Sequence, residues 1–469
     1  MGSVRFRLFI LLMILIAPAC LGGGGSNNKP PATLPSAPTS LASPSAASGR
    51  IDLTWIDTSN NEFEFRIERS DDGGVTYTQV GTAPKNIQGF TDLGLVAKKD
   101  YWYRVAAWNA KGLSPYAGPI MKSTTGLVWA AGSMTGEPGF GRGNHSAIYD
   151  SSSTGKRMIV FGGMDDFVAP YNDVWSYSLA SATPGNWSPL TTTGTPPLPR
   201  FGHSAVYDPL NNRMIVFGGI ALVPPPPPPP TLFPTFEHQN DVHVLNLTTL
   251  AWSQPAITGT PPTLRAFHSA IYDSMNERMV VYGGNGSGGQ ELDDVYFLSL
   301  GGAAPFSWTS PGLGARPVGR EQHASIFDPL QSRMVMFGGL DNETLLDGSV
   351  FANDTWTLPL TGSVSWGQLF FAGTPGFRMA HSAVYDATNQ RMVIFGGNIN
   401  SNPTATAEMW GLKLHTTPSW TILNKTSGSL PLPRSGHTAV YDSGFNRMIV
   451  YGGFDDFATT YDEVWFIDF

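Results

Sequence analysis

Short hydrophobic runs separated by turn residues recur along most of this chain, and they predict β-strands. One block holds four such runs, at residues 203–208, 213–219, 241–247 and around Trp252. The runs either alternate apolar with polar residues or form a β-branched and aromatic stretch too short for a helix. The block is therefore predicted to fold as a four-stranded antiparallel sheet.

The same block is repeated along the chain. Each copy opens with Arg-x-x-His, and the six pairs are Arg142/His145, Arg200/His203, Arg265/His268, Arg320/His323, Arg378/His381 and Arg434/His437. A repeat of roughly 50 to 65 residues is too short to bury a core by itself, so each unit must pack against its neighbours. We expect six small sheets arranged radially.

Two further features of the copies indicate a family. Each second strand ends in a glycine pair: Gly162/Gly163, Gly218/Gly219, Gly283/Gly284, Gly338/Gly339, Gly396/Gly397 and Gly452/Gly453. The fourth strands carry Trp187, Trp252, Trp308, Trp366 and Trp420. With the aromatic residue on the third strand, these features resemble the kelch motif over residues 127–469, and the resemblance implies a six-bladed β-propeller. Paired glycines permit positive φ and the close approach of a neighbouring blade.

The two ends of the repeat region predict how the ring closes. The last copy stops after its third strand, at residues 464–469, whereas Trp129 precedes the first Arg-x-x-His as Trp187 precedes the second. The N-terminal strand is therefore predicted to be the outer strand of the sixth blade, where it would protect an exposed edge.

Residues 36–125 show a different pattern of short alternating strands, as at 51–55, 63–67 and 101–105, which is typical of a sandwich. The segment resembles an immunoglobulin-like fibronectin type III domain. The resemblance implies a core tryptophan at Trp55 and a tyrosine corner at Tyr101, with Leu95 upstream. Residues 70–77 match an Asp-box, but their Asp-Gly-Gly lies between two predicted strands and is interpreted as a tight turn.

The N-terminus has the parts of an export signal. Arg5 and Arg7 precede an apolar run at residues 8–17, and Cys20, the only cysteine, follows. Residues 1–20 resemble a bacterial lipoprotein signal, which implies lipidation of Cys20, although Ala17 and Pro18 depart from the family pattern. The predicted location is the bacterial outer membrane or cell surface through a lipid anchor, with a periplasmic or secreted protein as the alternative. Residues 21–35 are predicted to be a flexible tether.

Charge narrows the choice of partners. The chain has 28 Lys and Arg against 36 Asp and Glu, and its net charge is −8. Without Arg5 and Arg7 the charge becomes −10, and no basic run is present, so nucleic acid and anionic membrane surfaces are not expected partners. A lipid anchor would be the only membrane contact, and the protein is predicted to be a monomer.

The candidate ligand face is the one where the Arg-x-x-His segments begin. The candidates are Arg142, Arg200, Arg265, Arg320, Arg378, Arg434, Asp165, Asp166, Asp455, Asp456, Phe233 and Phe236. The arginines have a structural interpretation that we favour, because each third strand begins with an acid that would pair with one of them. These acids are Asp173, Asp241, Asp294, Asp354, Glu408 and Glu463. Pairs such as Asp208 and Arg213 are predicted on the opposite face.

Three other features also have a structural and a functional interpretation: the histidines, the proline run and the Asp-Asp loops. The six histidines are predicted to be neutral and structural, and neither they nor the cluster of Glu237, His238, Asp241 and His243 is predicted to bind a metal. The second blade carries seven prolines at 224–230, a stiff rod that is either a recognition element or a tolerated insertion. The Asp165–Asp166 and Asp455–Asp456 loops either share a sector suited to sugars or Ca²⁺, or are solvated loop tips.

These features favour a cell-envelope binding protein without a catalytic residue, metal or cofactor, whose propeller face recognises a protein or a glycan. One alternative is a kelch carbohydrate-active enzyme of the sugar mutarotase type, in which Asp165, Asp455 and the arginines would supply acid and base groups. A copper radical oxidase of the galactose oxidase type is excluded, because its site requires a cysteine outside the signal. A structural adhesin is a second alternative.

Overall fold

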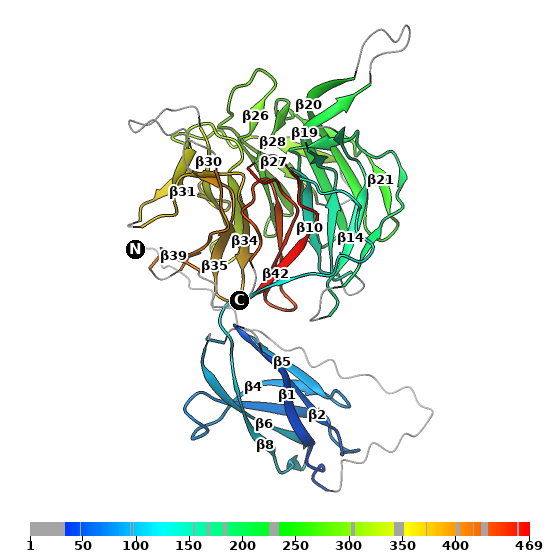
Figure 1. Ribbon diagram of the computed structural model, residues 1–469, viewed down its shortest axis with the longest axis vertical. Helices are drawn as coiled ribbons and strands as arrows, with labels where there is room; N and C mark the ends of the chain where they lie inside the picture. Colours follow the sequence, from blue (N-terminus) through cyan, green and yellow to red (C-terminus); the bar gives the residue numbers. More distant parts are fainter. Residues whose placement is uncertain are drawn as a thin grey trace, which may run out of the picture.

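The computed structural model describes residues 33–469, except for 47, 94, 97, 153–154, 167–168, 182–184, 225–233, 302–304, 342–350, 372, 400–403, 416, 424–429 and 457–458. Every regular element in the described residues is a strand, which confirms the predicted all-β class (Figure 1). No helix of the described part is long and apolar enough to cross a membrane. The predicted signal, Cys20 and nearly all of the predicted tether lie outside the described residues.

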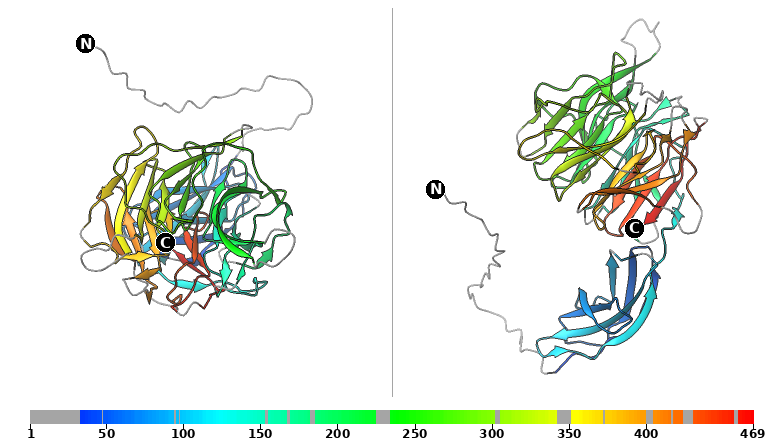
Figure 2. Two further views of the ribbon diagram at one scale, coloured as in Figure 1. Left: turned by 90° about the horizontal axis from the view of Figure 1, so that it is seen from above. Right: turned by 90° about the vertical axis from the view of Figure 1, so that its left-hand side faces the viewer.

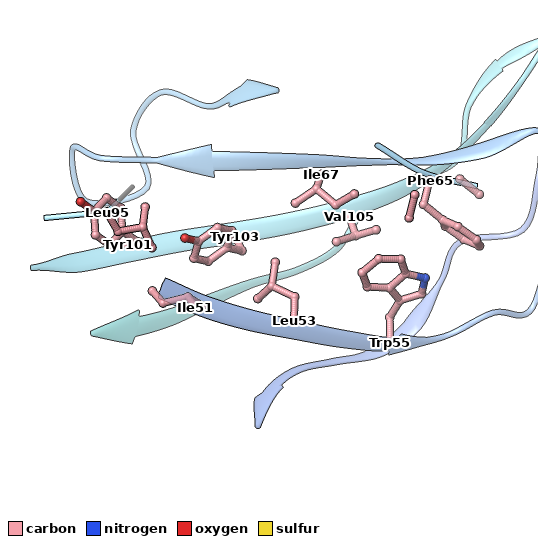
Figure 3. Packing of buried hydrophobic residues seen from close by; sticks show 11 residues of the cluster. Ile51, Leu53, Trp55, Phe65, Ile67, Leu95, Tyr101, Tyr103 and Val105 are labelled. Atoms are coloured by element: carbon pink, nitrogen blue, oxygen red, sulfur yellow. The ribbon is translucent and has the colours of Figure 1, made fainter. Parts of the chain in front are cut away.

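The N-terminal unit is a sandwich of two sheets. One sheet has the order β1-β2-β5, and the other β4-β3-β6-β7 with β8 paired to β6. Their bounds are β1 Thr39–Ala46, β2 Arg50–Ile56, β3 Glu64–Ser70, β4 Thr78–Pro84, β5 Gly89–Leu93, β6 Asp100–Asn109, β7 Gly112–Leu113 and β8 Ala117–Ser123. The core between the sheets contains Trp55 against Phe65, with ring centroids 5.4 Å apart, and the buried Tyr103 (Figure 3).

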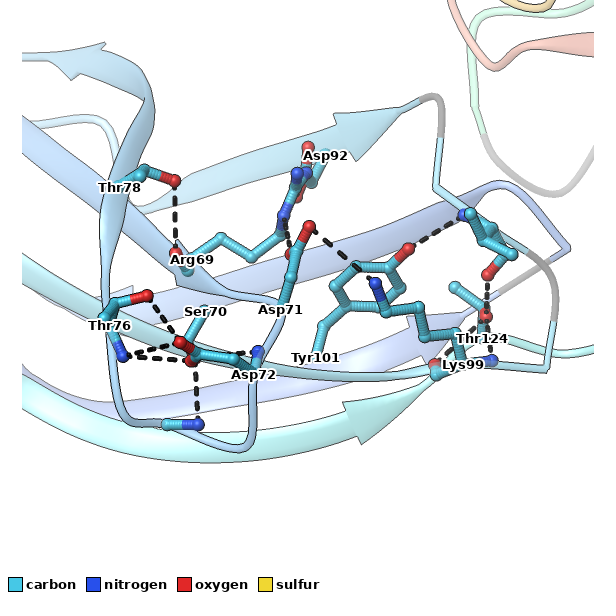
Figure 4. A network of polar contacts seen from close by, with 12 residues as sticks. Arg69, Ser70, Asp71, Asp72, Thr76, Thr78, Asp92, Lys99, Tyr101 and Thr124 are labelled. Carbon is cyan, nitrogen blue, oxygen red and sulfur yellow. Dashed lines mark hydrogen bonds and ion pairs between the residues drawn. The ribbon is translucent and has the colours of Figure 1, made fainter.

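Two local features of this sandwich match the sequence. The hydroxyl of Tyr101 accepts a hydrogen bond of 2.9 Å from the backbone N–H of Val96, which ties the start of β6 to the loop before it (Figure 4). The carboxylate of Asp72 accepts hydrogen bonds from the N–H groups of Val75 and Thr76 and from two hydroxyls, so the Asp-box segment is the turn between β3 and β4. These bonds lower the pKa of Asp72.

The rest of the chain forms six antiparallel sheets, each of four main strands, around a common centre (Figures 1 and 2). Their strands, from the centre outward, are β10 Ser146–Asp150, β11 Arg157–Phe161, β14 Val174–Ser178 and β15 Trp187–Pro189; β18 Ser204–Asp208, β19 Arg213–Val223, β20 Thr235–Asn246 and β21 Ala251–Ser253; β24 Ser269–Asp273, β25 Arg278–Tyr282, β27 Val295–Ser299 and β28 Phe306–Thr309; β29 Ala324–Asp328, β30 Arg333–Leu340, β31 Phe351–Pro359 and β32 Gly367–Leu369; β34 Ser382–Asp386, β35 Arg391–Phe395, β38 Met409–Lys413 and β39 Ser419–Ile422; β40 Thr438–Asp442, β41 Arg447–Tyr451, β42 Val464–Asp468 and β9 Trp129–Ala131.

Short strands connect or extend these sheets at their margins. They are β12 Met164–Asp165, β13 Ala169–Pro170, β16 Thr193–Gly194, β17 Arg200–Phe201, β22 Ile257–Gly259, β23 Arg265–Ala266, β26 Asn285–Gly286, β33 Arg378–Met379, β36 Asn398–Ile399 and β37 Thr404–Ala405. Strands β16 and β22 each run parallel to the outer strand of the following sheet, so they join neighbouring sheets edge to edge.

The hydrophobic cores lie between adjacent sheets. Each outer-strand tryptophan packs on an aromatic ring of the preceding sheet, as Trp252 does on Phe161 with centroids 5.1 Å apart. Strand β9 pairs with β42, and its Trp129 packs on Phe395 at 4.9 Å in the same way. The N-terminal strand therefore has both the backbone pairing and the aromatic contact of an outer strand.

A ring of backbone hydrogen bonds joins the six sheets near their common axis. The residue before each histidine donates its N–H to the corresponding carbonyl of a neighbouring sheet, in the order Asn144 to Gly436, Gly436 to Ala380, Ala380 to Gln322, Gln322 to Phe267, Phe267 to Gly202 and Gly202 to Asn144. All six residues have φ between 52° and 64°. This left-handed conformation turns each chain sharply into its innermost strand.

The side of the sheets that carries the Arg-x-x-His segments is called the upper face, and the other side the lower face. The β19–β20 pair projects from the upper face in Figure 1, and the sandwich lies below the lower face. Arg50 of the sandwich lies 3.8 Å from the carboxylate of Asp468 and 5.1 Å from the ring centroid of Phe445. The two parts of the molecule therefore meet at the lower margin of the sixth sheet.

Candidate functional site

The six arginines of the upper face are all bound to the acids that begin the third strands. Arg200 donates to the two carboxylate oxygens of Asp241 at 2.6 and 2.9 Å, and to the carbonyl of Gly218 at 2.9 Å. The same pairs join Arg142 to Asp173, Arg265 to Asp294, Arg320 to Asp354, Arg378 to Glu408 and Arg434 to Glu463. Each also donates to the first glycine of its glycine pair.

The two side chains of each ion pair differ in their exposure to solvent. The arginine side chains are 0–1% exposed, whereas their acidic partners are 23–42% exposed. The guanidinium groups are thus enclosed in the scaffold and do not reach a ligand, as the structural interpretation predicts. The carboxylate is therefore the member of each pair that reaches the surface.

Neighbouring side chains hold these carboxylates in place. The indole N–H groups of Trp175 and Trp356 donate to Asp173 and Asp354 at 2.7 and 2.6 Å. In the second sheet His243 occupies the equivalent position, with its Nε2 2.9 Å from Asp241. His243 therefore replaces the indole as a support for an ion pair, which accounts for its place beside Asp241 without a metal.

In the described part of the chain, no group of three or more His, Cys, Asp or Glu residues is placed to hold a metal ion. The carboxylates on the lower face form ion pairs with arginines of the same sheets. Asp208 binds Arg213 at 2.7 Å across its hairpin, and the other five sheets repeat the pair.

The six histidines lie around the axis and are linked from sheet to sheet. His203 Nε2 lies 2.9 Å from the hydroxyl of Ser146 in the preceding sheet, and His145, His268, His323 and His437 make the same contact with Thr438, Ser204, Ser269 and Ser382. His381 differs, because Ala324 stands where the other copies have Ser or Thr. Among these six histidines, His381 is the one whose Nε2 is buried without a hydrogen-bond partner among the described residues.

Burial lowers the pKa of all six histidines, and the adjacent arginines lower it further. The pKa falls to about 3 for His203, His323 and His437. The imidazoles are therefore neutral at physiological pH, and their role is to join neighbouring sheets.

A fall in stability below pH 6.5 is the expected result of these neutral imidazoles. The unfolded chain binds protons on its histidines below about pH 6.5, whereas the folded protein does so only near pH 3. The free energy of unfolding should therefore decrease as the pH falls through this window, by about 1.4 kcal/mol per pH unit for each histidine protonated only in the unfolded state. Denaturant unfolding at pH 7.5, 6 and 5 measures the slope. Equal stability at pH 7.5 and 5 would contradict neutral burial.

A small cavity lies on the axis at the upper face. Its volume is about 130 Å³, and its walls are the six histidines and the six residues before them. The histidines repeat, but the residues before them do not: they are Asn144, Gly202, Phe267, Gln322, Ala380 and Gly436. The opening is therefore chemically asymmetric, with amide groups and one aromatic ring among small residues.

The two Asp-Asp loops fasten neighbouring sheets to each other. Asp166 accepts hydrogen bonds from the N–H and hydroxyl of Thr460 at 2.9 and 3.0 Å, and Asp455 accepts one from Thr459 N–H at 2.8 Å. Asp456 reaches the N–H of Ala405 at 2.5 Å. Asp165 binds the N–H of Ala169 and, at 2.9 Å, the hydroxyl of Tyr171. Asp166 and Asp455 thus meet at one loop, where both have backbone partners.

The insertion of the second sheet is described only at its base, and the rod predicted at residues 224–230 stays a prediction. Strands β19 and β20 continue beyond Gly219 as a hairpin, with Leu222 opposite Phe236 and Val223 opposite Thr235. Most of the prolines and Phe233 lie outside the described residues. The base of the insertion is therefore a β-ribbon, which is called the arm. Phe236 lies on its second strand, β20, with 52% of its surface exposed.

Three phenylalanine rings lead from this arm to the axis. Phe236 contacts Phe201 with centroids 6.0 Å apart, and Phe201 contacts Phe267 at 6.1 Å. Phe267 lines the axial cavity. These three residues are called the phenylalanine stripe. Phe201 and Phe267 were not among the predicted candidates, although they occupy the variable interior of two Arg-x-x-His segments, and that variation was the available signal.

Comparison with known proteins identifies the repeat. The family model described as the KLHDC2/KLHL20/DRC7 Kelch-repeats domain matches residues 119–223 and 233–386, more than half of the chain. Host cell factor 2 of Homo sapiens is 30% identical over 289 residues, which cover 57% of this chain and 32% of that protein. Adagio protein 3 of Arabidopsis thaliana is 29% identical over 315 residues, covering 65% and 46%. This chain thus matches about a third to a half of the length of these relatives.

The fold has a counterpart among solved structures. The structure of YjhT aligns with a TM-score of 0.52 and 13% identity, over 70% of this chain and 95% of that one. At this identity the likeness concerns the fold alone. The glycine pairs, the inter-sheet tryptophans and the family match agree, and the chain belongs to the kelch-repeat family.

Proposed function

We propose that this protein is a non-catalytic binding protein of the bacterial cell envelope, whose upper face recognises a protein or glycan ligand. The observation that carries this proposal is the phenylalanine stripe. Aromatic rings in contact with one another and open to solvent are typical of recognition surfaces, because they bury much apolar area on binding. The candidate acid and base groups are engaged in fastening loops and sheets, which favours binding over sugar chemistry.

We further propose that the six sheets are the blades of one closed propeller, with β9 as the outer strand of the sixth blade. The ring of six backbone hydrogen bonds and the pairing of β9 with β42 support closure. Closure removes the free sheet edges that would otherwise favour aggregation. The sandwich is proposed to be a fibronectin type III domain, supported by the buried Trp55 and the bond from Val96 to Tyr101.

We also propose a cellular location for the protein. Lipidation at Cys20 would anchor the chain to the outer membrane or cell surface, and residues 21–35 with the sandwich would space the propeller from it. The sandwich lies at the lower face, so the upper face would point away from the anchor (Figure 2). Metabolic labelling with an acyl chain in a bacterial host, compared with Cys20→Ser, tests the anchor.

Replacing Phe236 with serine is expected to weaken ligand binding by about tenfold to thirtyfold, because an exposed aromatic anchor is lost. Folding should be unaffected, since the side chain is 52% exposed. Screening of the full chain on a glycan array and in pull-downs identifies the ligand, and titration of the variant measures the change. Removal of residues 220–236 should have a larger effect.

The matched control is Phe370→Ser, because Phe370 is 82% exposed and lies after the outer strand β32, away from the stripe. This control should bind as the unchanged protein does. If Phe236→Ser and the deletion both keep full affinity for every ligand found, the upper face is not the recognition surface and the adhesin alternative is favoured.

A further inference from the structure

The outer edge of strand β20 is open where the arm projects from the second sheet (Figure 1). Strand β21 pairs with β20 only at residues 244–246, whereas β20 begins at Thr235. From Thr235 to Gln239, its strand partner is β19, which lies on the inner side. Within the described part of the chain, no strand pairs with the other side of this stretch. Residues 235–239 are therefore a strand segment with one free edge.

The hydrogen bonds of β19 show which backbone groups face that edge. The N–H of Leu222 donates to the carbonyl of Pro199 at 3.0 Å, on the side of β17 and away from β20. Leu222 and its partner Phe236 therefore form a non-hydrogen-bonded pair of the ladder, so the N–H and C=O of Phe236 point outward. His238, two residues further along the same strand, points its backbone groups outward as well. Two donors and two acceptors are thus available to a further strand.

A cavity lies at the foot of this edge, where β21 ends. Its volume is about 260 Å³, and Pro255, Ile257 and Trp308 are among the residues that line it. In the first and fifth sheets, Leu190 and Leu423 extend the pairing of the outer strand by donating their N–H groups to the third strand. Pro255 stands at the corresponding position of the second sheet and has no N–H to donate, so the pairing of β21 with β20 ends earlier. The cavity therefore adjoins the free edge and has apolar walls that suit a side chain.

One face of the arm continues the phenylalanine stripe. Leu222 lies opposite Phe236, and Ile220 lies between Phe201 of β17 and His238 of β20. Because residues two apart in a strand share a face, all five side chains belong to the same face. The ring contact of Phe201 with Phe236 agrees with this arrangement. A strand added at the outer edge would place every second side chain on this face, beside Phe236, where apolar pairs across strands are stabilising.

We propose that an extended polypeptide segment binds this protein by pairing with the outer edge of β20, with one apolar side chain beside Phe236 and another in the cavity at Pro255. This inference rests on the proposed function and names its partner class. From Phe236 to Asn240, which lines the cavity, the strand rises by about 13 Å, so a segment of about six residues reaches both places. A glycan has no row of alternating N–H and C=O groups to complete the ladder, so the free edge favours a polypeptide.

A second copy of this chain fits the edge less well than a foreign segment does. Antiparallel pairing of two identical edges about their middle would place the two Glu237 residues directly or diagonally opposite each other. Like charges at such positions destabilise a pair of strands. A segment without an acidic residue there avoids this repulsion.

The test begins with a phage-displayed library of random ten-residue peptides, selected against the full chain. Each enriched peptide is then synthesised in two further forms, with N-methyl groups on one or the other set of alternate backbone nitrogens. Methylation of the set that faces β20 removes the donors of the ladder without changing a side chain, so the affinity should fall at least about tenfold. Methylation of the other set should change the affinity by less than about threefold. Failure to enrich any peptide, or equal effects of the two methylated sets, overturns the proposal.

Two variants of one residue locate the edge. His238→Pro removes an outward N–H, so it should weaken binding of the enriched peptides at least about tenfold. His238→Ala is the matched control, because it loses the same side chain but keeps the N–H, and it should weaken binding by less than about threefold. The N–H of His238 is not used in the ladder with β19, so both variants should unfold at similar denaturant concentrations. Equal affinities of the two variants overturn the proposal.

A third variant tests the cavity. Gln254 is exposed and lines the cavity, so Gln254→Trp should fill part of it and weaken binding by about fivefold. Ser253→Trp is the control, because Ser253 is exposed on the adjoining residue but does not line the cavity. Unchanged affinity in Gln254→Trp overturns the placement of a side chain in the cavity.

The outcomes separate this inference from the proposed function. If no peptide is enriched but a glycan binds and is lost in Phe236→Ser, the inference is wrong while the recognition face stands. A dimer that dissociates in His238→Pro would place a second copy on the edge and would also overturn the inference alone. If Phe236→Ser leaves every ligand bound, the proposed function fails as well.

Discussion

Replacing Asp294 with alanine is expected to lower the free energy of unfolding by about 3–5 kcal/mol, because it leaves a buried charge without its counter-ion. Arg265 is 0% exposed, and Asp294 accepts from its two terminal nitrogens at 2.6 and 3.0 Å. The carbonyls of Thr263 and Gly283 would remain its partners, but carbonyl groups carry no charge to balance the guanidinium. Denaturant unfolding measures the loss.

The preceding residue is the matched control. Asp293 also binds an arginine at 2.6 Å, but Arg316 and Asp293 are 41% and 39% exposed, so Asp293→Ala should cost at most about 1 kcal/mol. Adding Arg265→Met to Asp294→Ala should recover part of the stability, because the unpaired charge is removed. Equal losses for Asp293→Ala and Asp294→Ala would show that the ring arginines are not held by their acids.

Replacing Gly219 with alanine is expected to cost more than about 3 kcal/mol, since it combines an unfavourable backbone conformation with a steric clash. Gly219 has φ of +94°, and a Cβ there would lie 2.7 Å from the Cβ of His203 and 2.8 Å from the carbonyl oxygen of Phe201. Either the ring of histidines or strand β17 must move. Because β17 carries Phe201, ligand binding should weaken along with stability.

Gly289 separates the two causes. Its φ is +78°, but no atom lies within 4 Å of a Cβ built there, so Gly289→Ala should cost only the backbone term of about 1–2 kcal/mol. A thermal or denaturant comparison of the two variants gives the difference. If both lose the same stability, close approach is not the reason for the second glycine of the pair.

Much of the fold could be predicted because the repeat is local and periodic. The four strands of each sheet, the glycine pairs and the acid opposite each arginine all lie within one copy, so spacing alone indicates their pairing. Trp129 lies far along the chain from the strand with which it pairs, but its place before the first Arg-x-x-His, like that of Trp187 before the second, indicated an outer strand. Its contact with Phe395 follows the same arrangement as in the other sheets.

The candidate site was less predictable. The arginines were the most prominent residues of the face, yet the structure encloses them and exposes their acidic partners. Which member of an ion pair reaches solvent depends on the depth of each strand end, and sequence spacing does not encode that depth. The aromatic rings of Phe201 and Phe267 belong to different sheets, so their contact requires the radial arrangement.

The sequence by itself thus determined the all-β class, the sixfold repeat and the pairs that fasten each copy, because these depend on contacts between residues close along the chain. Only the tertiary structure decided which member of each ion pair reaches solvent, the course of the phenylalanine stripe and the missing partner of His381 Nε2. The first depends on how deeply each strand end is buried, and the other two arise between neighbouring sheets. The missing partner of His381 stands at Ala324, in the preceding copy, and only packing of one sheet against the next brings the two positions together.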